Sequence, residues 1–138
     1  MDRELAERVA LMAIHPRYAN AIMDGHKTVE FRKRSLADDI RTVWVYATAP
    51  VSRVIGRFTV EEIHKDTPGA IWDRFGDAGV IERDAFFRYY ASNEAAVAIV
   101  VSNADRFPEP LALGALNPQP AIPQSFAYIS AGSQPNPC

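Results

Sequence analysis

Apolar residues recur along the chain in the short runs and alternations that are typical of β-strands. Residues 8–15 form an almost continuous apolar run that Pro16 ends, which predicts a buried strand. A later alternating segment contains Gly56, which predicts a bulge or a close approach of backbone there. The run at 95–107 is strongly apolar and is expected near the centre of the sheet. The predicted strands are at residues 8–15, 27–34, 41–50, 52–64, 95–107 and 126–129.

Three short segments between these strands have the end signals of helices. Pro16 suits the first turn of one helix, and Gly25 suits the position after its last turn. Asp66 or Thr67 suits the cap of a second helix, with Pro68 at its start. The predicted helices are at residues 16–25, 66–79 and 81–94.

These elements predict an α+β fold of five to six strands and two to three short helices, and three strand-like segments close together favour a small β-barrel. The chain of 138 residues suits one domain, expected at 9–130 between an N-terminal extension at 1–8 and a flexible tail at 131–138. Its one cysteine is Cys138, which excludes an internal disulfide and a cysteine metal site. The chain is expected to be cytoplasmic, without a membrane span, cofactor or metal.

Charge changes this picture at one place, residues 27–34. Val29 and Phe31 alternate there with Glu30, Arg32 and Arg34, so the apolar and charged side chains of a strand would point to opposite faces. The first 60 residues contain 10 Lys and Arg against 7 Asp and Glu, whereas the whole chain has a net charge of −2. A local basic patch can bind phosphate even in an acidic protein, although a solvated strand face is the commoner meaning of such a pattern.

The same segment is the centre of a resemblance to a known family. Three stretches carry it: MAIHPRYANAIMDGHKTVEFRKR at 12–34, VWVYATAPVSRVIGRFTVEEI at 43–63 and IPQSFAYI at 122–129. With Gly25, Lys27, Glu30 and Arg32 as its most recognisable element, the sequence resembles the ASCH family, which is related to the PUA superfamily, and its regulator-like branch in particular.

The resemblance implies a PUA-like fold, a small mixed β-barrel with a cleft that binds RNA or a nucleotide. It assigns Lys27, Glu30 and Arg32 to that cleft. The softer candidates are Tyr46, Gln124 and Ser125, at less diagnostic positions, together with His15, where the first strand meets the helix, and Arg34, which the alternation places on the same face. Arginine and lysine would hold phosphate, and Glu30 would orient them or accept a hydrogen bond from a base amino group.

The leading hypothesis is therefore an RNA- or nucleotide-binding protein that acts as a regulator of transcription or translation. The alternative is a hydrolase, either a ribonuclease or an enzyme like the family's acetylcytidine amidohydrolases. In those enzymes a threonine occupies the position of Glu30, so a carboxylate base with Lys27 as oxyanion partner would have to replace it. An enclosed pocket with Glu30 close to Lys27 would favour an enzyme, and an open groove would favour binding alone.

A third hypothesis is a protein-interaction domain that uses an aromatic helix. Phe86, Tyr89 and Tyr90 share one predicted helical face, and with Phe87 they would form an apolar patch if exposed. Core packing is the commoner role of such a face. Base stacking is a less common alternative, and the exposure of these four side chains distinguishes core packing from the two surface roles.

Overall fold

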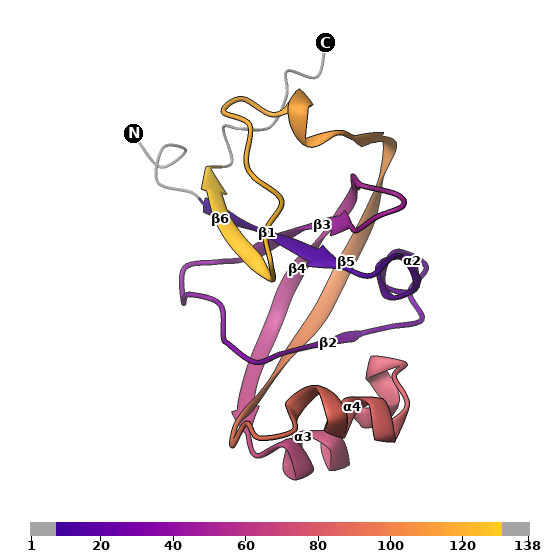
Figure 1. Cartoon of the computed structure of the whole chain (residues 1–138), viewed down its shortest axis with the longest axis vertical. Helices are drawn as coiled ribbons and strands as arrows, with labels where there is room; N and C mark the ends of the chain where they lie inside the picture. The colour runs from indigo at the N-terminus through magenta and orange to yellow at the C-terminus, as the bar shows by residue number, and fades with distance from the viewer. Residues whose placement is uncertain (1–7, 131–138) are drawn as a thin grey trace.

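The structure, a computed structural model, describes residues 8–130. Its centre is a six-stranded mixed sheet with the strand order β2-β5-β4-β3-β1-β6 (Figure 1). Strands β1 and β3 are parallel, and the other neighbours are antiparallel. The strands are β1 (Arg8–Ile14), β2 (Val29–Arg32), β3 (Thr42–Ala47), β4 (Arg53–Asp66), β5 (Ala96–Leu111) and β6 (Phe126–Ser130).

The two longest strands, β4 and β5, give the sheet its curl. They run side by side along the length of the molecule in Figure 1, and their pairing register shifts at three places. Such irregularities bend strands and increase their twist. Gly56 lies at one of these shifts, which confirms the predicted bulge. Strand β5 lies between β4 and the edge strand β2, so it is interior but not central.

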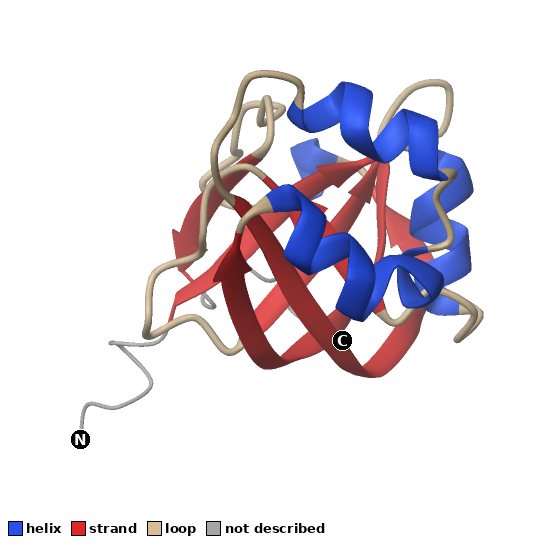
Figure 2. Ribbon diagram, turned by 90° about the horizontal axis from the view of Figure 1, so that it is seen from below, coloured by secondary structure: helices blue, strands red, loops and turns tan. Residues whose placement is uncertain are grey.

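Three helices and two 3-10 turns cover the sheet, and Figure 2 shows the helices packed along one side of the crossing strands. The helices are α2 (Pro16–Met23), α3 (Pro68–Phe75) and α4 (Arg83–Tyr90), and the turns are η1 (Gly76–Gly79) and η2 (Leu113–Ala115). Thr67 caps α3 by accepting a hydrogen bond from the Ala70 amide at 3.2 Å, as its sequence signal predicts. After α2 the chain turns through Gly25 at φ +85°, a conformation that glycine adopts without steric cost.

Apolar side chains form three clusters, because both faces of the curled sheet are covered. The first fills the inside of the curl and includes Met12, Val45 and Ile99. The second, around Trp44, lies on the outer face under the segment that contains η2. The third packs the outer face of β2 and β5 against α3 and α4, with Phe86 at its centre.

The fold agrees with the α+β, PUA-like prediction, with six strands and three helices, although the sheet is open between β2 and β6 and not a closed barrel. The predicted strand at 27–34 is shorter, since only Val29–Arg32 pairs with β5. Strand β1 includes Arg8, and the predicted tail at 131–138 lies outside the described residues. Among residues 8–130, no helix is both long and apolar enough to cross a membrane.

Candidate functional site

Successive side chains of β2 point to opposite faces of the sheet, and both faces are buried. Val29 and Phe31 share one face, as the alternation predicts, and they enter the apolar cluster under α3 and α4. Glu30 and Arg32 point to the opposite face, yet they are buried as well, at 6% and 8% exposure. The Tyr90 hydroxyl of α4 donates to the Arg32 carbonyl at 2.8 Å, so the helix holds the end of the strand in place.

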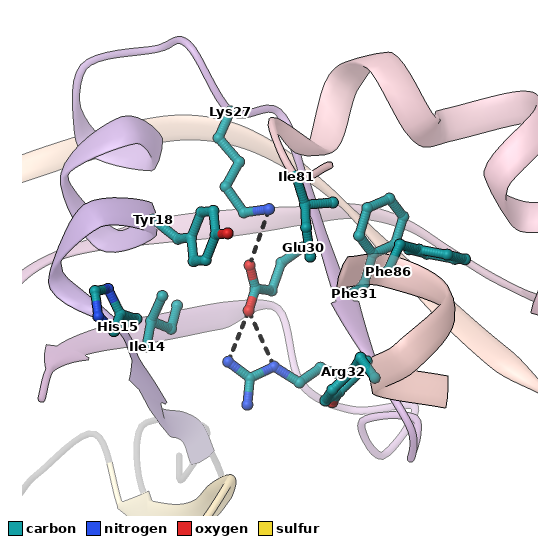
Figure 3. A pocket seen from close by; sticks show the side chains of 10 residues that line it. Ile14, His15, Tyr18, Lys27, Glu30, Phe31, Arg32, Ile81 and Phe86 are labelled. Atoms are coloured by element: carbon teal, nitrogen blue, oxygen red, sulfur yellow. Dashed lines mark hydrogen bonds and ion pairs between the residues drawn. The ribbon is translucent and has the colours of Figure 1, made fainter. Parts of the chain in front are cut away.

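Glu30 lies between two cations and pairs with both (Figure 3). Its Oε2 accepts hydrogen bonds from Arg32 Nε at 3.1 Å and from Arg32 Nη2 at 2.7 Å. Its Oε1 lies 3.5 Å from the Lys27 Nζ. Lys27 is only 3% exposed, so the whole triad is withdrawn from bulk water. Burial of two cations is tolerable here because each is paired and hydrogen-bonded.

Arg32 also spans the seam of the sheet, which is the open gap between the edge strands β2 and β6. Its Nη2 donates to the Ala13 carbonyl of β1 at 3.0 Å, and its Nη1 donates to the Ser125 hydroxyl, just before β6, at 3.1 Å. The Ala13 amide in turn donates to the Ser125 carbonyl at 2.8 Å. The guanidinium therefore links edge strand β2 to β1 and to the start of β6, which do not pair with it.

Lys27 is held from the opposite side by η1. Its ammonium donates to the Gly79 carbonyl and lies 5.1 Å from the Tyr18 ring centroid and 5.4 Å from that of Phe31. A side chain at position 79 would collide with the Phe31 ring, so glycine permits this close approach. Burial lowers the pKa of Lys27 below its ordinary value, and the nearby Glu30 carboxylate opposes that change.

The triad forms the polar side of a pocket of about 190 Å³ (Figure 3). The other walls are mostly apolar and aromatic. They come mainly from α2, from the loop that follows η1, and from α4. The lining residues are Ile14, His15, Tyr18, Lys27, Glu30, Phe31, Arg32, Ile81, Phe86 and Tyr89. A pocket with apolar walls and a few convergent polar groups is the usual form of a small-molecule site.

The hydrogen-bonding capacity of the triad is not exhausted by its internal contacts. A guanidinium has five N–H donors and an ammonium has three. Four hydrogen bonds from Arg32 and one from Lys27, with the ion pair to Glu30, leave one donor on each cation. A carboxylate oxygen has two lone pairs, and the Lys27 ammonium at 3.5 Å uses one of those on Glu30 Oε1. The site can thus both donate and accept toward a ligand.

The structure brings together five of the eight predicted site residues. Lys27, Glu30, Arg32 and His15 line the pocket, and Ser125 bonds to Arg32 behind it. His15 is exposed at the edge, and its Nδ1 accepts from the Arg17 amide at 3.2 Å as the cap of α2.

Arg34, Tyr46 and Gln124 lie outside the pocket lining. Arg34 follows the last paired residue of β2, so the alternation no longer applies, and its guanidinium lies 4.9 Å from the Phe126 ring centroid. Tyr46 is buried in the outer cluster around Trp44, because alternation along β3 points it away from the triad. Gln124 is exposed beside Ser125.

The sequence predicted the aromatic walls of the pocket only in part, because base stacking was the less common alternative to core packing for the aromatic helix. It placed Tyr89 on the same face as Phe86 and Tyr90, but these two are buried whereas Tyr89 is 38% exposed and lines the pocket. Burial of its inner part raises the pKa of the Tyr89 hydroxyl, and nearby Arg32 opposes the change. Tyr18 was assigned only to the packing face of α2. Its position one turn after His15 was the available signal.

The triad suits an anion or a polar ligand more than a metal, because two of its three members are cations. Elsewhere within residues 8–130, no three His, Cys, Asp or Glu side chains come together as a metal site requires. The aromatic helix leaves Phe86 and Tyr90 in the core and Phe87 half-buried, so it does not present the continuous apolar patch that a protein-interaction surface would need.

Comparisons with known proteins identify the family and the fold. Residues 12–107 match the family model of the ASCH domain. A protein of Zymomonas mobilis named ASCH domain-containing ribonuclease is 33% identical over 93 residues, which are 67% of this chain and 63% of that protein. The crystal structure of ASCH from Zymomonas mobilis superposes with a TM-score of 0.84 at 28% identity and covers 91% of this chain and 90% of that one.

Part of the large ribosomal subunit protein uL22 of Ureaplasma parvum is 26% identical over 129 residues, 93% of this chain and 41% of that protein. The chain therefore spans less than two-thirds of the length of these curated relatives.

Proposed function

The chain belongs to the ASCH domain family, and we propose that it binds RNA, with the base or the phosphate of one nucleotide in the pocket over Lys27, Glu30 and Arg32. The observation that carries this proposal is the charge balance of the buried triad. Two cations share one carboxylate, so the polar side of the pocket has a net positive charge while Lys27 is protonated. A positive site with little access to water attracts phosphate strongly, because low dielectric strengthens charge interactions.

The remaining walls suit a nucleobase. Tyr18 and Tyr89 supply aromatic surface, and Ile81 and Phe86 supply apolar surface. Base stacking on such rings tolerates any sequence, since every base has a π-face. The volume of about 190 Å³ is below the roughly 300–1,000 Å³ of pockets for drug-sized ligands. The pocket therefore fits a single base or a single phosphate group, not a folded RNA.

Glu30 gives the pocket a means of selecting among bases. Its Oε1 is available to accept a hydrogen bond from a base N–H, whereas Lys27 and Arg32 each have a donor left for a carbonyl or phosphate oxygen. An unmatched polar group in such a buried place is costly, so a ligand that satisfies all three is favoured.

Ribonuclease activity is the second candidate, and two observations favour it. The relative from Zymomonas mobilis is named a ribonuclease. Glu30 lies 3.5 Å from a buried lysine whose pKa is lowered, in a pocket with mostly apolar walls, which is the arrangement expected of an enzyme. In this scheme the Lys27 amine accepts the proton of a 2′-hydroxyl, and the 2′-oxygen then attacks phosphorus. The bond to the 5′-oxygen breaks, water protonates that oxygen, and Arg32 stabilises the charge on the phosphate.

Amidohydrolase chemistry has less support from the contacts of Glu30. Two hydrogen bonds from Arg32 occupy its Oε2, and Lys27 faces its Oε1. Glu30 is thus held in place as the counter-charge of both cations. A regulatory role in transcription or translation, and a cytoplasmic location, stay predictions from the sequence.

A titration with two readouts tests the proposal. Fluorescently labelled RNA is titrated with protein and followed by anisotropy, and the same samples are run on a denaturing gel. Lys27→Ala should weaken binding about 10- to 150-fold, the worth of a hydrogen bond to a charged group. Arg57→Ala is the matched control, because Arg57 is an exposed cation of β4 that does not line the pocket.

Equal affinity of the parent and Lys27→Ala would reject the pocket as the RNA site. Cleaved RNA that ends in a cyclic phosphate, produced by the parent and by Arg57→Ala but not by Lys27→Ala, would establish the ribonuclease. Intact RNA at saturating protein would leave binding alone.

A further inference from the structure

A cation and an aromatic ring lie together on the rim of the pocket. Lys33 follows Arg32 directly, and its Nζ lies 4.8 Å from the centroid of the Tyr89 ring. Tyr89 belongs both to the pocket lining and to the surface, since it is 38% exposed. The chain thus passes from a buried arginine in the pocket to an exposed lysine over an exposed ring within two residues.

Another pair on this side has a different character. Arg34 lies 4.9 Å from the Phe126 ring centroid, but Phe126 is only 9% exposed and is part of the inner core cluster. Its ring cannot receive a further group on the surface. Tyr89 can, because its side chain is 38% exposed and the group over its ring is an ammonium on a flexible stem.

Exchange of that ammonium for a base is favourable on two counts. An exposed cation–π contact is worth less than a base stacked on an aromatic ring. The displaced ammonium remains within the reach of its own side chain, where it can pair with the phosphate of the same nucleotide. A nucleotide at this position therefore replaces one weak contact by two stronger ones.

We infer that Tyr89 and Lys33 form a second nucleotide subsite, which binds the neighbour of the nucleotide in the pocket. This inference rests on the proposed function, and it makes the ligand a single strand of at least two nucleotides. A base in the pocket and the next base on Tyr89 must both be unpaired. In duplex RNA the bases are stacked inside the helix and present neither face, so a duplex cannot occupy both subsites.

The test compares mononucleotides with dinucleotides on the same protein. The probes are the four nucleoside 5′-monophosphates and the matching labelled dinucleotides, 2′-O-methylated so that attack by the 2′-oxygen is blocked. The parent should bind dinucleotides more tightly than mononucleotides. Tyr89→Ala should reduce that ratio about 5- to 150-fold, whereas Tyr89→Phe should preserve it.

Lys33→Ala should weaken the dinucleotide and leave the mononucleotide unchanged, because Lys33 does not line the pocket. For a longer single strand, the affinity of Lys33→Ala should depend less on salt than that of the parent. The slope of log affinity against log salt should be smaller by about 0.7, which corresponds to the loss of one phosphate contact. Thermal unfolding of each variant checks that the fold is intact.

The outcomes separate this inference from the proposed function. If Lys27→Ala abolishes binding but Tyr89→Ala and Lys33→Ala keep the parent's ratio, the second subsite is wrong and the pocket stands. If duplex RNA competes as well as a single strand, the second subsite is also wrong. If the parent binds neither probe, both proposals fail together.

Discussion

The segment from Lys27 to Arg34 contains four cations in two contrasting environments. Lys27 and Arg32 are buried at 3% and 8% exposure, and both pair with the same carboxylate. Lys33 and Arg34 are exposed, and each lies over an aromatic ring instead of an acid. The same residue types are thus paired with an acid in the buried triad and stacked over aromatic rings on the exposed rim.

The two environments differ in the number of hydrogen-bond partners that a charged side chain needs from the protein. A buried ion needs partners for nearly all of its hydrogen bonds, whereas an exposed ion keeps its water. A buried ion cluster is weak evidence for stability, because apolar residues of similar volume often stabilise a core as well or better. Under the proposed function the triad serves a ligand, and Arg32 also serves the fold by spanning the seam.

The largest expected effect is the loss of the Arg32 guanidinium. Arg32→Ala should lower the free energy of unfolding by about 3–5 kcal/mol, because it strips the two hydrogen bonds from buried Glu30 and opens the link to Ala13 and Ser125. Urea unfolding followed by fluorescence measures this loss. Arg8→Ala is a surface control, since Arg8 makes a similar two-bond contact to Asp39 in solvent and should matter far less.

A second variant shows whether the cost comes from the unpaired charge. Replacement of the triad by Lys27→Met, Glu30→Leu and Arg32→Met together should cost less stability than Arg32→Ala alone, because no buried charge is left without a partner. RNA binding should be lost in the triple variant. A larger destabilisation than Arg32→Ala would show that the ion cluster itself holds the fold together.

An intermediate effect is expected from the pH dependence of Lys27. Burial lowers its pKa from 10.5, so between the lowered pKa and 10.5 the unfolded chain binds more protons at this residue than the folded protein. Stability should rise with pH through that window, and the cost of the buried ammonium is fully present only below it. Relative to Lys27→Met, the parent should gain about 1.4 kcal/mol for each unit of pKa lowering.

Urea unfolding of both proteins at pH values from 7 to 10 measures this gain. If the free energies of unfolding of the two proteins change with pH in parallel, Lys27 titrates at its ordinary pKa. Its burial would then have no measurable effect on its charge. Protonation of Tyr89 and Tyr90 is shared by the two proteins, and burial raises the pKa of both hydroxyls, so their contribution cancels in the difference.

The smallest effect is expected on the rim, at Arg34. Arg34→Ala should lower the free energy of unfolding by at most about 1 kcal/mol, the worth of an exposed cation–π contact. Its affinity for a mononucleotide should equal that of the parent, because Arg34 lies outside the pocket lining. Anisotropy and urea unfolding on the same preparation measure both. A loss of affinity like that of Lys27→Ala would return Arg34 to the site.

Local signals in the sequence were sufficient for most elements. Pro16, Thr67 and Pro68 marked helix starts correctly, and Gly56 marked the bulge, because capping, ring constraint and missing side chains act within a few residues. The alternation along β2 also predicted correctly that Val29 and Phe31 share one face and Glu30 and Arg32 the other, but its extension to Arg34 fails because the strand ends at Arg32.

The sequence pattern could not predict which face of a strand or helix would be buried and which would border the pocket. Alternation assigns Tyr46 to one side of β3, but only the segment around η2 makes that side a buried one, far from the triad. Likewise, one helical face contained Phe86, Tyr89 and Tyr90, and the position of β2 decided that Tyr89 would border the pocket. Contacts between segments that are distant in sequence carry this information, and no single window contains it.

The sequence by itself determined the family, the α+β class, the order of the elements and the placement of Glu30 and Arg32 on one face of a strand. Only the tertiary structure decided that this face is buried, that Lys27 reaches it from the preceding turn, and that Arg32 crosses an open seam to Ala13 and Ser125. The physical reason is range. Periodicity and capping are local properties of the chain, whereas burial and charge pairing depend on which remote segments exclude water from a side chain.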